Sequence, residues 1–323
     1  MLKSLLETDK ESKIDTELKA LIFDIKRDCS EDGPGIRSTV FFKGCPLSCS
    51  WCQNPEAVTR SPALSYRREL CTPEQCGVPC VDVCPTNSLK LADKSSIQVN
   101  HDLCNRCNRC FKVCPTQALE PVGYWITVDE LLYKVLIDKP FFKSTGGGVT
   151  VSGGEATLQA EFLAAFLQGL KAEGIHTALE TSGFFNYPSF QKQLLPNLDL
   201  IYFDLKLINE EKHRLYTGQS NKPILANLAR LSQEAKIPIQ VRVPLIPEIT
   251  ATKENLSDIA DFLKALNISN VELLPYNPLW QDKLQRFGLK SDYDHKKFMT
   301  VEEQENCVKY FLSKTASTPT TQD

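Results

Sequence analysis

The order of apolar and polar residues after residue 127 predicts strands and helices in alternation. Short apolar runs near residues 149, 177, 200, 239 and 271 are typical of strands buried on both faces. Residues 158–172 predict an amphipathic helix whose apolar face is made of Leu158, Phe162, Ala165, Phe166 and Leu170. Further helices are expected over residues 128–138, 224–235, 256–266 and 302–312. Strands that alternate with helices in this way predict a parallel sheet.

The N-terminal third adds two predicted strands, over residues 21–25 and 38–42. With the first strand counted, the chain has about six βα units, which predicts an α/β fold of the partial TIM-like (β/α)6 barrel type. An open barrel leaves a gap at its side that suits a protein loop as substrate. We expect residues 1–65 to form the first part of the barrel, 66–120 an insertion with a hairpin near 96–99, 121–312 the rest of the barrel and 313–323 a flexible tail. Residues 1–20 are expected to be a short helix or a loose arm.

The composition narrows the class of protein. The chain has 323 residues, 24% of them charged and 42% apolar, as in ordinary globular proteins. Its 37 Lys and Arg against 40 Asp and Glu give a net charge of −3, which argues against a broad basic surface for nucleic acid. No apolar run approaches the roughly 18 residues of a membrane span, and the N-terminus lacks the apolar core of a signal peptide. We therefore expect a cytoplasmic protein without a membrane or nucleic-acid partner, whose 13 cysteines indicate metal ligation rather than disulfides.

Two runs of cysteines each end in Cys-Pro. The second run fits C-x2-C-x2-C-x3-C-P, which is typical of bacterial ferredoxins, and the first is a stretched version of it. Such a pair predicts two [4Fe–4S] clusters in a ferredoxin-like unit, with the last Cys of each run bound to the other cluster. The expected ligand sets are Cys71, Cys76, Cys80 and Cys114 for one cluster, and Cys104, Cys107, Cys110 and Cys84 for the other. Grouping by proximity along the chain stays open as an alternative, and structural zinc fits less well.

A third group has only three cysteines, Cys45, Cys49 and Cys52, in the pattern C-x3-C-x2-C. Three thiolates on a cubane cluster leave one iron without a protein ligand, and an open coordination position is how a metal site performs chemistry. Pro46 and Pro55 suit a tight, non-helical loop around it. The two remaining cysteines, at positions 29 and 307, are expected to be small buried apolar residues.

Around this triplet the chain resembles the radical S-adenosylmethionine (SAM) superfamily and, more narrowly, the activating enzymes of glycyl radical enzymes. The segments that carry the resemblance lie within residues 21 to 280, in the family's order: Asp32 to Arg37, the triplet, Gly146 to Glu155, Glu180 to Gly183, Asp204 to Lys206, and Leu273 to Tyr276. The insertion is similar to that of the activators of glycerol dehydratase, choline trimethylamine-lyase, benzylsuccinate synthase and hydroxyphenylacetate decarboxylase. The pyruvate formate-lyase activator lacks such an insertion.

The resemblance implies an oxidoreductase with a defined reaction. SAM would bind the open iron of the triplet cluster, and one electron would cleave its carbon–sulfur bond. The resulting 5′-deoxyadenosyl radical would remove a hydrogen from the Cα of a glycine in a partner glycyl radical enzyme. The implied cofactors are three [4Fe–4S] clusters, with SAM as cosubstrate, and the implied electron donor is a flavodoxin or ferredoxin in an anaerobic cytoplasm. The two further clusters would either relay electrons or hold the partner.

The resemblance also assigns residues around SAM. These are Trp51, Cys52, Gln53, Gly153, Gly154, Glu155, Glu180, Thr181, Asp204, Leu205, Lys206, Arg242 and Asn277. A loop that is catalytic or faces the partner is assigned to Asp32, Gly33 and Arg37. The residues themselves support part of this assignment, because Asp204 and Lys206 close a predicted strand on one face, at the end where barrel enzymes place their sites.

For some of these positions, alternatives or departures from the family stand beside the assignment. Ordinary packing is an equal alternative for Trp51, a surface charge for Arg242 and a plain turn for the glycines at 153–154. Asn277 stands where the pyruvate formate-lyase type has a His, so it can donate and accept hydrogen bonds but cannot carry a proton. Glu180 stands where some relatives have an Asp beside a bound cation.

Two other functions remain open at this point. One is a different radical SAM enzyme with auxiliary clusters, acting on a peptide or a small molecule; the segment Asp32 to Arg37 and the early position of the insertion weigh against it. The other is an electron-transfer protein in which the barrel is only a scaffold.

Overall fold

The structure is a computed structural model that describes residues 18–315. The expected N-terminal arm and C-terminal tail therefore lie mostly outside the described residues. Where the expected arm and tail overlap with the described residues, the structure corrects the boundary of each. Lys19 and Ala20 already belong to the first strand, and the last helix continues to Thr315, three residues beyond its expected end at 312.

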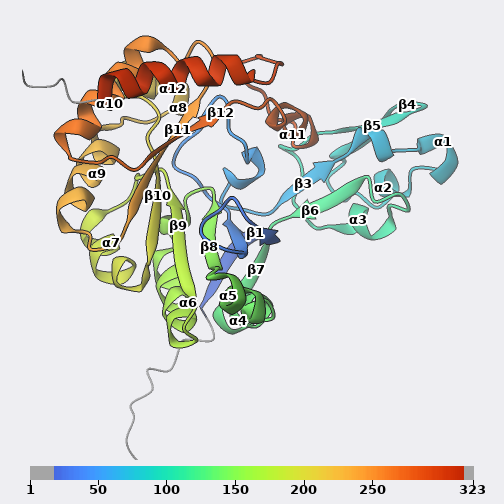
Figure 1. Ribbon diagram of the computed structural model, residues 1–323. Helices are drawn as coiled ribbons and strands as arrows, with labels where there is room; N and C mark the ends of the chain where they lie inside the picture. Colours follow the sequence, from blue (N-terminus) through green and yellow to red (C-terminus); the bar gives the residue numbers. More distant parts are fainter. Residues whose placement is uncertain (1–17, 316–323) are drawn as a thin grey trace, which may run out of the picture.

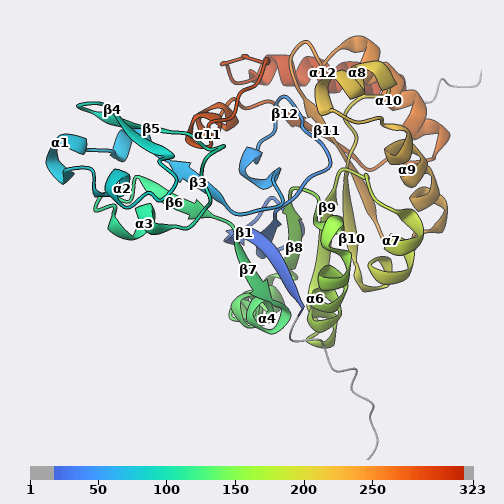
Figure 2. The same cartoon turned by 180° about the vertical axis from the view of Figure 1, so that it is seen from behind.

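An eight-stranded sheet forms the barrel, in the order β12-β11-β10-β9-β8-β2-β1-β7 (Figures 1 and 2). Six neighbouring strands are parallel: β2 (Arg37–Phe42), β8 (Gly148–Gly153), β9 (His176–Thr181), β10 (Leu200–Asp204), β11 (Ile239–Leu245) and β12 (Val271–Pro275). The other two, β1 (Lys19–Cys29) and β7 (Tyr124–Thr127), are antiparallel to their neighbours. Among the described residues the outer strands β12 and β7 do not pair, so the predicted partial barrel is confirmed.

Helices cover the outer face of the sheet. They are α4 (Val128–Leu136), α5 (Lys139–Thr145), α6 (Ala160–Ala172), α7 (Tyr187–Gln193), α8 (Glu210–Thr217), α9 (Lys222–Glu234), α10 (Lys253–Ala265) and α12 (Val301–Thr315). Helix α11 (Trp280–Arg286) lies instead beside the insertion, in contact with residues 55–57 and 63–66. Phe162, Phe166 and Leu170 of α6 are buried against the sheet as the sequence predicts, and each such burial stabilises the fold by about 2 kcal/mol. Between residues 18 and 315, no helix combines the length and the apolar character that a membrane crossing requires.

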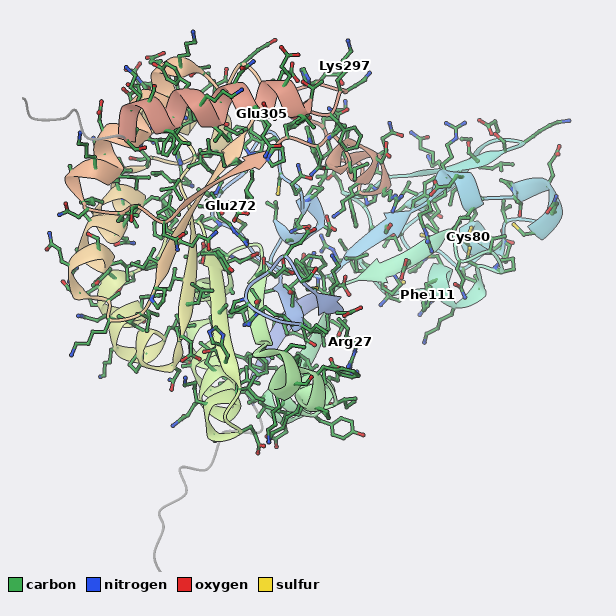
Figure 3. All side chains as sticks on the ribbon, in the orientation of Figure 1. Arg27, Cys80, Phe111, Glu272, Lys297 and Glu305 are labelled. Carbon is green, nitrogen blue, oxygen red and sulfur yellow. The ribbon has the colours of Figure 1, made fainter. Side chains whose placement is uncertain are left out.

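The cysteine-rich insertion projects from one side of the barrel (Figure 1). Its ends are joined by β3 (Ala63–Tyr66) and β6 (Leu119–Val122), which pair antiparallel with Ala63 opposite Val122. Between them lie β4 (Leu89–Asp93), β5 (Ser96–Val99), α1 (Pro73–Cys76), α2 (Pro79–Asp82) and α3 (Arg109–Val113). The expected hairpin at 96–99 is confirmed by the pairing of β4 with β5. In Figure 3, Cys80 lies inside the insertion whereas Glu272 lies on the barrel.

The described residues also form short 3-10 helices at Pro55–Ala57, Arg68–Leu70, Ala156–Gln159 and Leu195–Asn197. The turn at 156–159 takes the place of the first residues of the helix expected from residue 158. Of the two remaining cysteines, Cys29 is buried as expected, whereas Cys307 is only half-buried and packs against the main hydrophobic core.

Candidate active site

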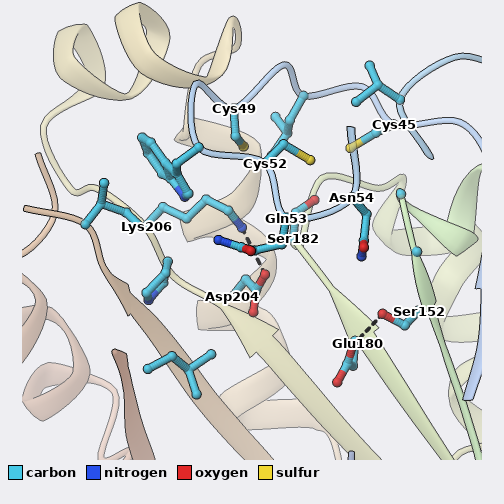
Figure 4. A pocket seen from close by; sticks show the side chains of 18 of the residues that line it. Cys45, Cys49, Cys52, Gln53, Asn54, Ser152, Glu180, Ser182, Asp204 and Lys206 are labelled. Carbon is cyan, nitrogen blue, oxygen red and sulfur yellow. Dashed lines mark hydrogen bonds and ion pairs between the residues drawn. The ribbon is translucent and has the colours of Figure 1, made fainter. Parts of the chain in front are cut away.

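The cysteine triplet lies on the loop that follows β2, and the C-terminal end of α8 holds this loop by its backbone. The N–H groups of Ser48 and Ser50 donate to the carbonyls of Thr217 and Tyr216, each over 2.9 Å. Figure 4 shows the three cysteines of the triplet along one edge of a cleft, above Lys206 and the end of β10. The loop therefore presents its thiols to the C-terminal ends of the barrel strands, where barrel enzymes carry their chemistry.

Most of the residues expected around SAM line this one cleft. They are Cys45, Cys49, Trp51, Cys52, Gln53, Gly153, Gly154, Glu180, Thr181, Asp204, Lys206 and Asn277. The expected residues that do not line it, within the described part of the chain, are Asp32, Gly33, Arg37, Glu155, Leu205 and Arg242. The cleft thus brings together segments that are far apart in the sequence, and the six other residues lie outside its lining.

Gly153 and Gly154 let the end of β8 lie directly against the cysteine loop. Gly153 has φ +111°, a conformation that favours glycine, and a Cβ on Gly154 would lie 2.3 Å from the carbonyl oxygen of Gly44. The N–H of Gly154 donates to the carbonyl of Phe42 over 2.9 Å. A side chain at Gly154 would push β8 away from the loop, and a side chain at Gly153 would collide with the backbone of Phe42 in β2, so close packing and not only a turn requires both glycines.

Lys206 supplies a positive charge beside the thiols. Its Nζ lies 3.1 Å from Asp204 Oδ2, and its side chain is only 9% exposed. Burial alone lowers the pKa of an ammonium, but the Asp204 carboxylate outweighs burial through its charge and its hydrogen bond and raises the pKa of Lys206 above its usual value, and a thiolate at Cys49 acts in the same direction. The ammonium therefore stays protonated inside the cleft.

The three thiols fit an iron–sulfur cluster better than a single ion. Burial raises the pKa of Cys45 to about 12 and also raises that of Cys49 and of Cys52, so thiolates there need positive charge such as iron supplies. Among residues 18–315, no three His, Cys, Asp or Glu side chains converge closely enough to hold one metal ion. Tetrahedral zinc would need sulfurs about 3.8 Å apart, whereas a cluster places its own irons and sulfides between the thiolates.

Arg242 stands behind the cleft wall and holds Glu180. Its Nη1 lies 2.6 Å from Glu180 Oε1, its Nε lies 3.2 Å from Glu272 Oε2, and its guanidinium stacks 3.6 Å from the ring of Tyr202. The surface-charge alternative is wrong, because the side chain is 10% exposed. Burial raises the pKa of Glu180, although Arg242 and the donating hydroxyl of Ser152 both lower it. The pair fixes the Glu180 carboxylate at the cleft.

Glu155 also acts one layer behind the cleft. Its side chain has no accessible surface and accepts hydrogen bonds from the hydroxyls of Thr157 and Thr181 and from both the N–H and the hydroxyl of Ser182. These donors lie just beyond β8 and at the end of β9, so the carboxylate ties two cleft-lining strand ends together. The side chain of Leu205, by contrast, lies in the hydrophobic core.

The segment Asp32 to Arg37 packs into the sheet. Arg37 is fully buried, where it donates to Thr150 Oγ1 over 2.7 Å and to the carbonyl of Val149 over 2.8 Å. Burial lowers the pKa of Arg37 to about 10. A Cβ on Gly33 would lie 2.8 Å from Arg37 Cδ, so this glycine is needed for the loop to pass over the arginine. Arg37 therefore holds the loop and does not itself face a partner.

Trp51 is both a packed residue and a residue of the cleft lining. It is 4% exposed and packs with Ile246, Tyr276 and Trp280 in a second hydrophobic cluster, yet its ring also lines the cleft. Its packing fixes the loop next to Cys52.

Sequence reasoning missed several lining residues. Ser152 and Ser182 each lie one position from an expected residue at a strand end. They could have been predicted, because barrel enzymes place their sites at the C-terminal ends of the strands. Asn54 follows an expected residue in the cysteine loop. No local signal pointed to Lys283 of α11, which binds this loop from 229 residues away.

The cysteines of the insertion surround two small cavities. One is lined by Cys71, Cys76, Cys80 and Cys114, and the other by Cys84, Cys104, Cys107 and Cys110. Each cavity thus takes the last Cys of the other run. The grouping by proximity along the chain does not match either cavity.

Three family models match the chain. The radical SAM superfamily matches residues 102–263, the LdpA Fe-S cluster-binding domain matches residues 71–125, and a 4Fe-4S single cluster domain matches residues 31–74. Iron–sulfur binding and the radical SAM class, both expected from the cysteine patterns, are thereby confirmed.

Curated relatives are similar over most of their length. The isethionate sulfite-lyase activating enzyme of Oleidesulfovibrio alaskensis is 38% identical over 271 residues, which cover 83% of this chain and 87% of the relative. The 4-hydroxyphenylacetate decarboxylase activating enzyme of Clostridioides difficile is 34% identical over 299 residues, 92% of this chain and 94% of the relative.

Among solved structures, a radical SAM methyltransferase from Sphaerobacter thermophilus has a similar fold. Its TM-score is 0.51 at 14% identity, over 91% of this chain and 74% of that chain. The expected fold and enzyme class are confirmed together. With relatives this similar over this much of the chain, the protein belongs to the glycyl-radical enzyme activating enzymes of the radical SAM superfamily.

Proposed function

We propose that this chain binds SAM in the cleft at the C-terminal ends of the barrel strands and uses it to generate a glycyl radical on a partner enzyme. The observation that carries the proposal is that all three thiols of the triplet share one cleft with the polar strand ends at Glu180, Asp204 and Lys206. Bound to these thiols, a [4Fe–4S] cluster supplies an iron with an open position and one electron for reductive cleavage of SAM.

The residues of the chain prepare the cleft for a charged, amphipathic ligand. The protonated Lys206 offers positive charge to a carboxylate, and the glycines at the end of β8 allow close approach to the backbone. Asp204 and Glu180 offer negative charge to an ammonium or a sulfonium. Leu47, Ile246 and the buried Trp51 and Tyr276 line the same space and exclude water from it.

We further propose two auxiliary clusters in residues 66–120, with the crossed ligand sets that surround the two cavities. This gives three clusters in all, and the insertion is then a separate unit between the barrel segments 1–65 and 121–312. A small electron-transfer protein, a flavodoxin or a ferredoxin, supplies the electron in the cytoplasm.

The partner is a glycyl radical enzyme. The relatives support this class, because their names join an activating enzyme to isethionate sulfite-lyase in one case and to 4-hydroxyphenylacetate decarboxylase in the other. Within residues 18–315, β7 and β12 end the sheet without pairing with each other, which is compatible with the entry of a loop of such a partner at this side.

The decisive experiment combines iron analysis with a radical assay. The anaerobically reconstituted chain should hold about 12 iron atoms, cleave SAM under dithionite and give a glycyl doublet in electron paramagnetic resonance (EPR) spectra when its partner is present. Cys49→Ala should abolish cleavage and leave about 8 iron atoms. The matched control Cys307→Ala, which changes a cysteine outside all three groups, should cleave SAM as the unchanged chain does. Cleavage by Cys49→Ala, or cleavage without a glycyl radical on any partner, would contradict the proposal.

A further inference from the structure

The amino group of Lys283, on α11, binds the loop directly after the triplet. Its Nζ donates to the carbonyl of Gln53 over 2.9 Å, to Asn54 Oδ1 over 3.3 Å and to Glu56 Oε1 over 2.8 Å. Gln53 and Asn54 line the cleft, whereas Lys283 does not. One side chain thus fixes two lining residues from behind.

These contacts close a ring of interactions around one end of the cleft. The side-chain amide of Gln53 donates to the carbonyl of Asn277 over 3.1 Å, and Asn277 follows β12. Asn277 Oδ1 in turn accepts from the N–H of Leu279, the residue before α11. Lys283 of α11 contacts Gln53, which closes the ring. The ring therefore joins the cysteine loop to β12, the strand at one edge of the sheet.

Lys283 also forms an ion pair with Glu56, so the effect of its charge on Glu56 must be distinguished from its effect on the position of the loop. The side chain of Glu56 is 11% exposed, and its Oε2 is buried with no hydrogen-bond partner among residues 18–315. Lys43, a buried second cation, donates to the backbone carbonyl of Glu56 rather than to its carboxylate. Lys283 is therefore both a clamp on the loop and the counter-ion of Glu56.

We infer that Lys283 is a positioning residue for SAM, holding Gln53 and Asn54 in the orientation that the ligand meets. The inference rests on the proposed binding of SAM in this cleft. Because Lys283 does not line the cleft, it acts on the affinity for SAM rather than on bond cleavage. Losing the clamp frees the segment that follows Cys52, and misplacement of this kind typically weakens function by about tenfold to a hundredfold.

The test compares three variants under anaerobic conditions: Lys283→Met, Lys283→Arg, and the double variant Glu56→Gln with Lys283→Met. In the double variant the Glu56 carboxylate is neutralised together with Lys283, so no carboxylate is left unpaired there, but the clamp is still missing. Lys283→Met should keep its iron, raise KM for SAM about tenfold and change kcat by less than about twofold. The SAM concentration that converts the EPR spectrum of the reduced cluster should rise by the same factor. Lys283→Arg should recover part of the affinity, and the double variant should not.

Two results would overturn the inference. One is an unchanged KM and EPR titration in Lys283→Met. The other is full recovery in the double variant, which would mean that Lys283 only neutralises Glu56. Lys309→Met, which removes an exposed lysine on α12 paired with Glu305, is the control and should match the unchanged chain. If the unchanged chain itself fails to cleave SAM, the proposed function fails and not this inference.

Discussion

At the scale of single residues, the carboxylate of Glu155 organises the cleft without reaching it. It has no accessible surface, and four donor groups converge on its two oxygens. Two of these donors belong to Ser182, which lines the cleft together with Thr181. The position of the end of β9 at the cleft therefore depends on a side chain that does not itself line the cleft.

Glu155→Gln should destabilise the protein by about 3 kcal/mol, because the amide nitrogen cannot accept from donors that remain buried. Anaerobic thermal unfolding of the reconstituted chain measures the change, and SAM affinity should fall with it. Glu173→Gln removes an exposed carboxylate paired with Lys139 and should barely change the unfolding temperature. Equal unfolding temperatures for the two variants would show that the hydrogen bonds of Glu155 contribute nothing beyond those of a surface group.

The contrast between the triplet and Arg242 shows which residue roles a sequence can predict. Cys45, Cys49 and Cys52 are identified by local spacing, because one short loop must present all three thiols. Arg242 meets Glu180 across 62 residues and Lys283 meets Gln53 across 230, and no periodicity or motif encodes such meetings. Sequence reasoning therefore found the cysteine triplet by its spacing, named Arg242 as a contact of SAM rather than as the partner of Glu180, and missed Lys283.

At the scale of elements, the turn after α8 sets the position of the cysteine loop. Gly218 ends this helix with φ +78°, and a Cβ there would lie 2.5 Å from Ser48 Oγ. Gly174, after α6, has nearly the same backbone conformation at φ +69°, but a Cβ there would meet nothing within 4 Å. The two glycines share the conformational requirement and differ in what surrounds them.

Gly218→Ala and Gly174→Ala should each destabilise the fold by about 1–2 kcal/mol, because both force alanine into a left-handed conformation. Only Gly218→Ala should also weaken SAM binding and alter the SAM-induced EPR change, since it pushes on Ser48. Combining Gly218→Ala with Ser48→Ala removes the obstructing hydroxyl and should restore binding but not stability. Equal SAM affinities for the two single variants would rule out this coupling.

The parallel strands are the elements that the sequence predicts best. Strands β8, β9 and β10 are buried along most of their length, which gives each a local signature. Strand β11 is buried in its second half, and the edge strand β12 is only half-buried, although both were predicted from their apolar residues. Strand β1 extends beyond its apolar part at 21–25, and the added residues Lys26, Arg27 and Asp28 are exposed charged residues that give no apolar signal. Its antiparallel pairing with β2 and β7 depends on register with distant residues, which the apolar pattern does not contain.

At the scale of the whole molecule, the insertion brings two distant cysteine runs together around shared cavities. Cys114 lies with Cys76 at one cavity, whereas Cys107 of its own run lies at the other. Removing ligands in pairs therefore distinguishes crossed from sequential grouping.

The double variant with Cys76→Ala and Cys114→Ala should lose one cluster and keep about 8 iron atoms, because both ligands belong to one site. The double variant with Cys107→Ala and Cys114→Ala removes one ligand from each site, so its iron content should differ from about 8 atoms. It should hold about 12 iron atoms if three thiolates retain a cluster and about 4 if they do not. Iron and sulfide analysis, together with EPR of the reduced protein, measures the number of clusters that each variant holds. Reversed values for the two double variants would establish the sequential grouping.

The antiparallel stem formed by β3 and β6 has a consequence for the history of this architecture. Ala63 and Val122 face each other, so the chain leaves the barrel and returns to it at one place. Deleting or acquiring the intervening cassette during evolution would leave the path of the remaining polypeptide unchanged. An ancestral gene could therefore recruit a ready-made metal-binding module in one recombination event, without a new barrel having to arise.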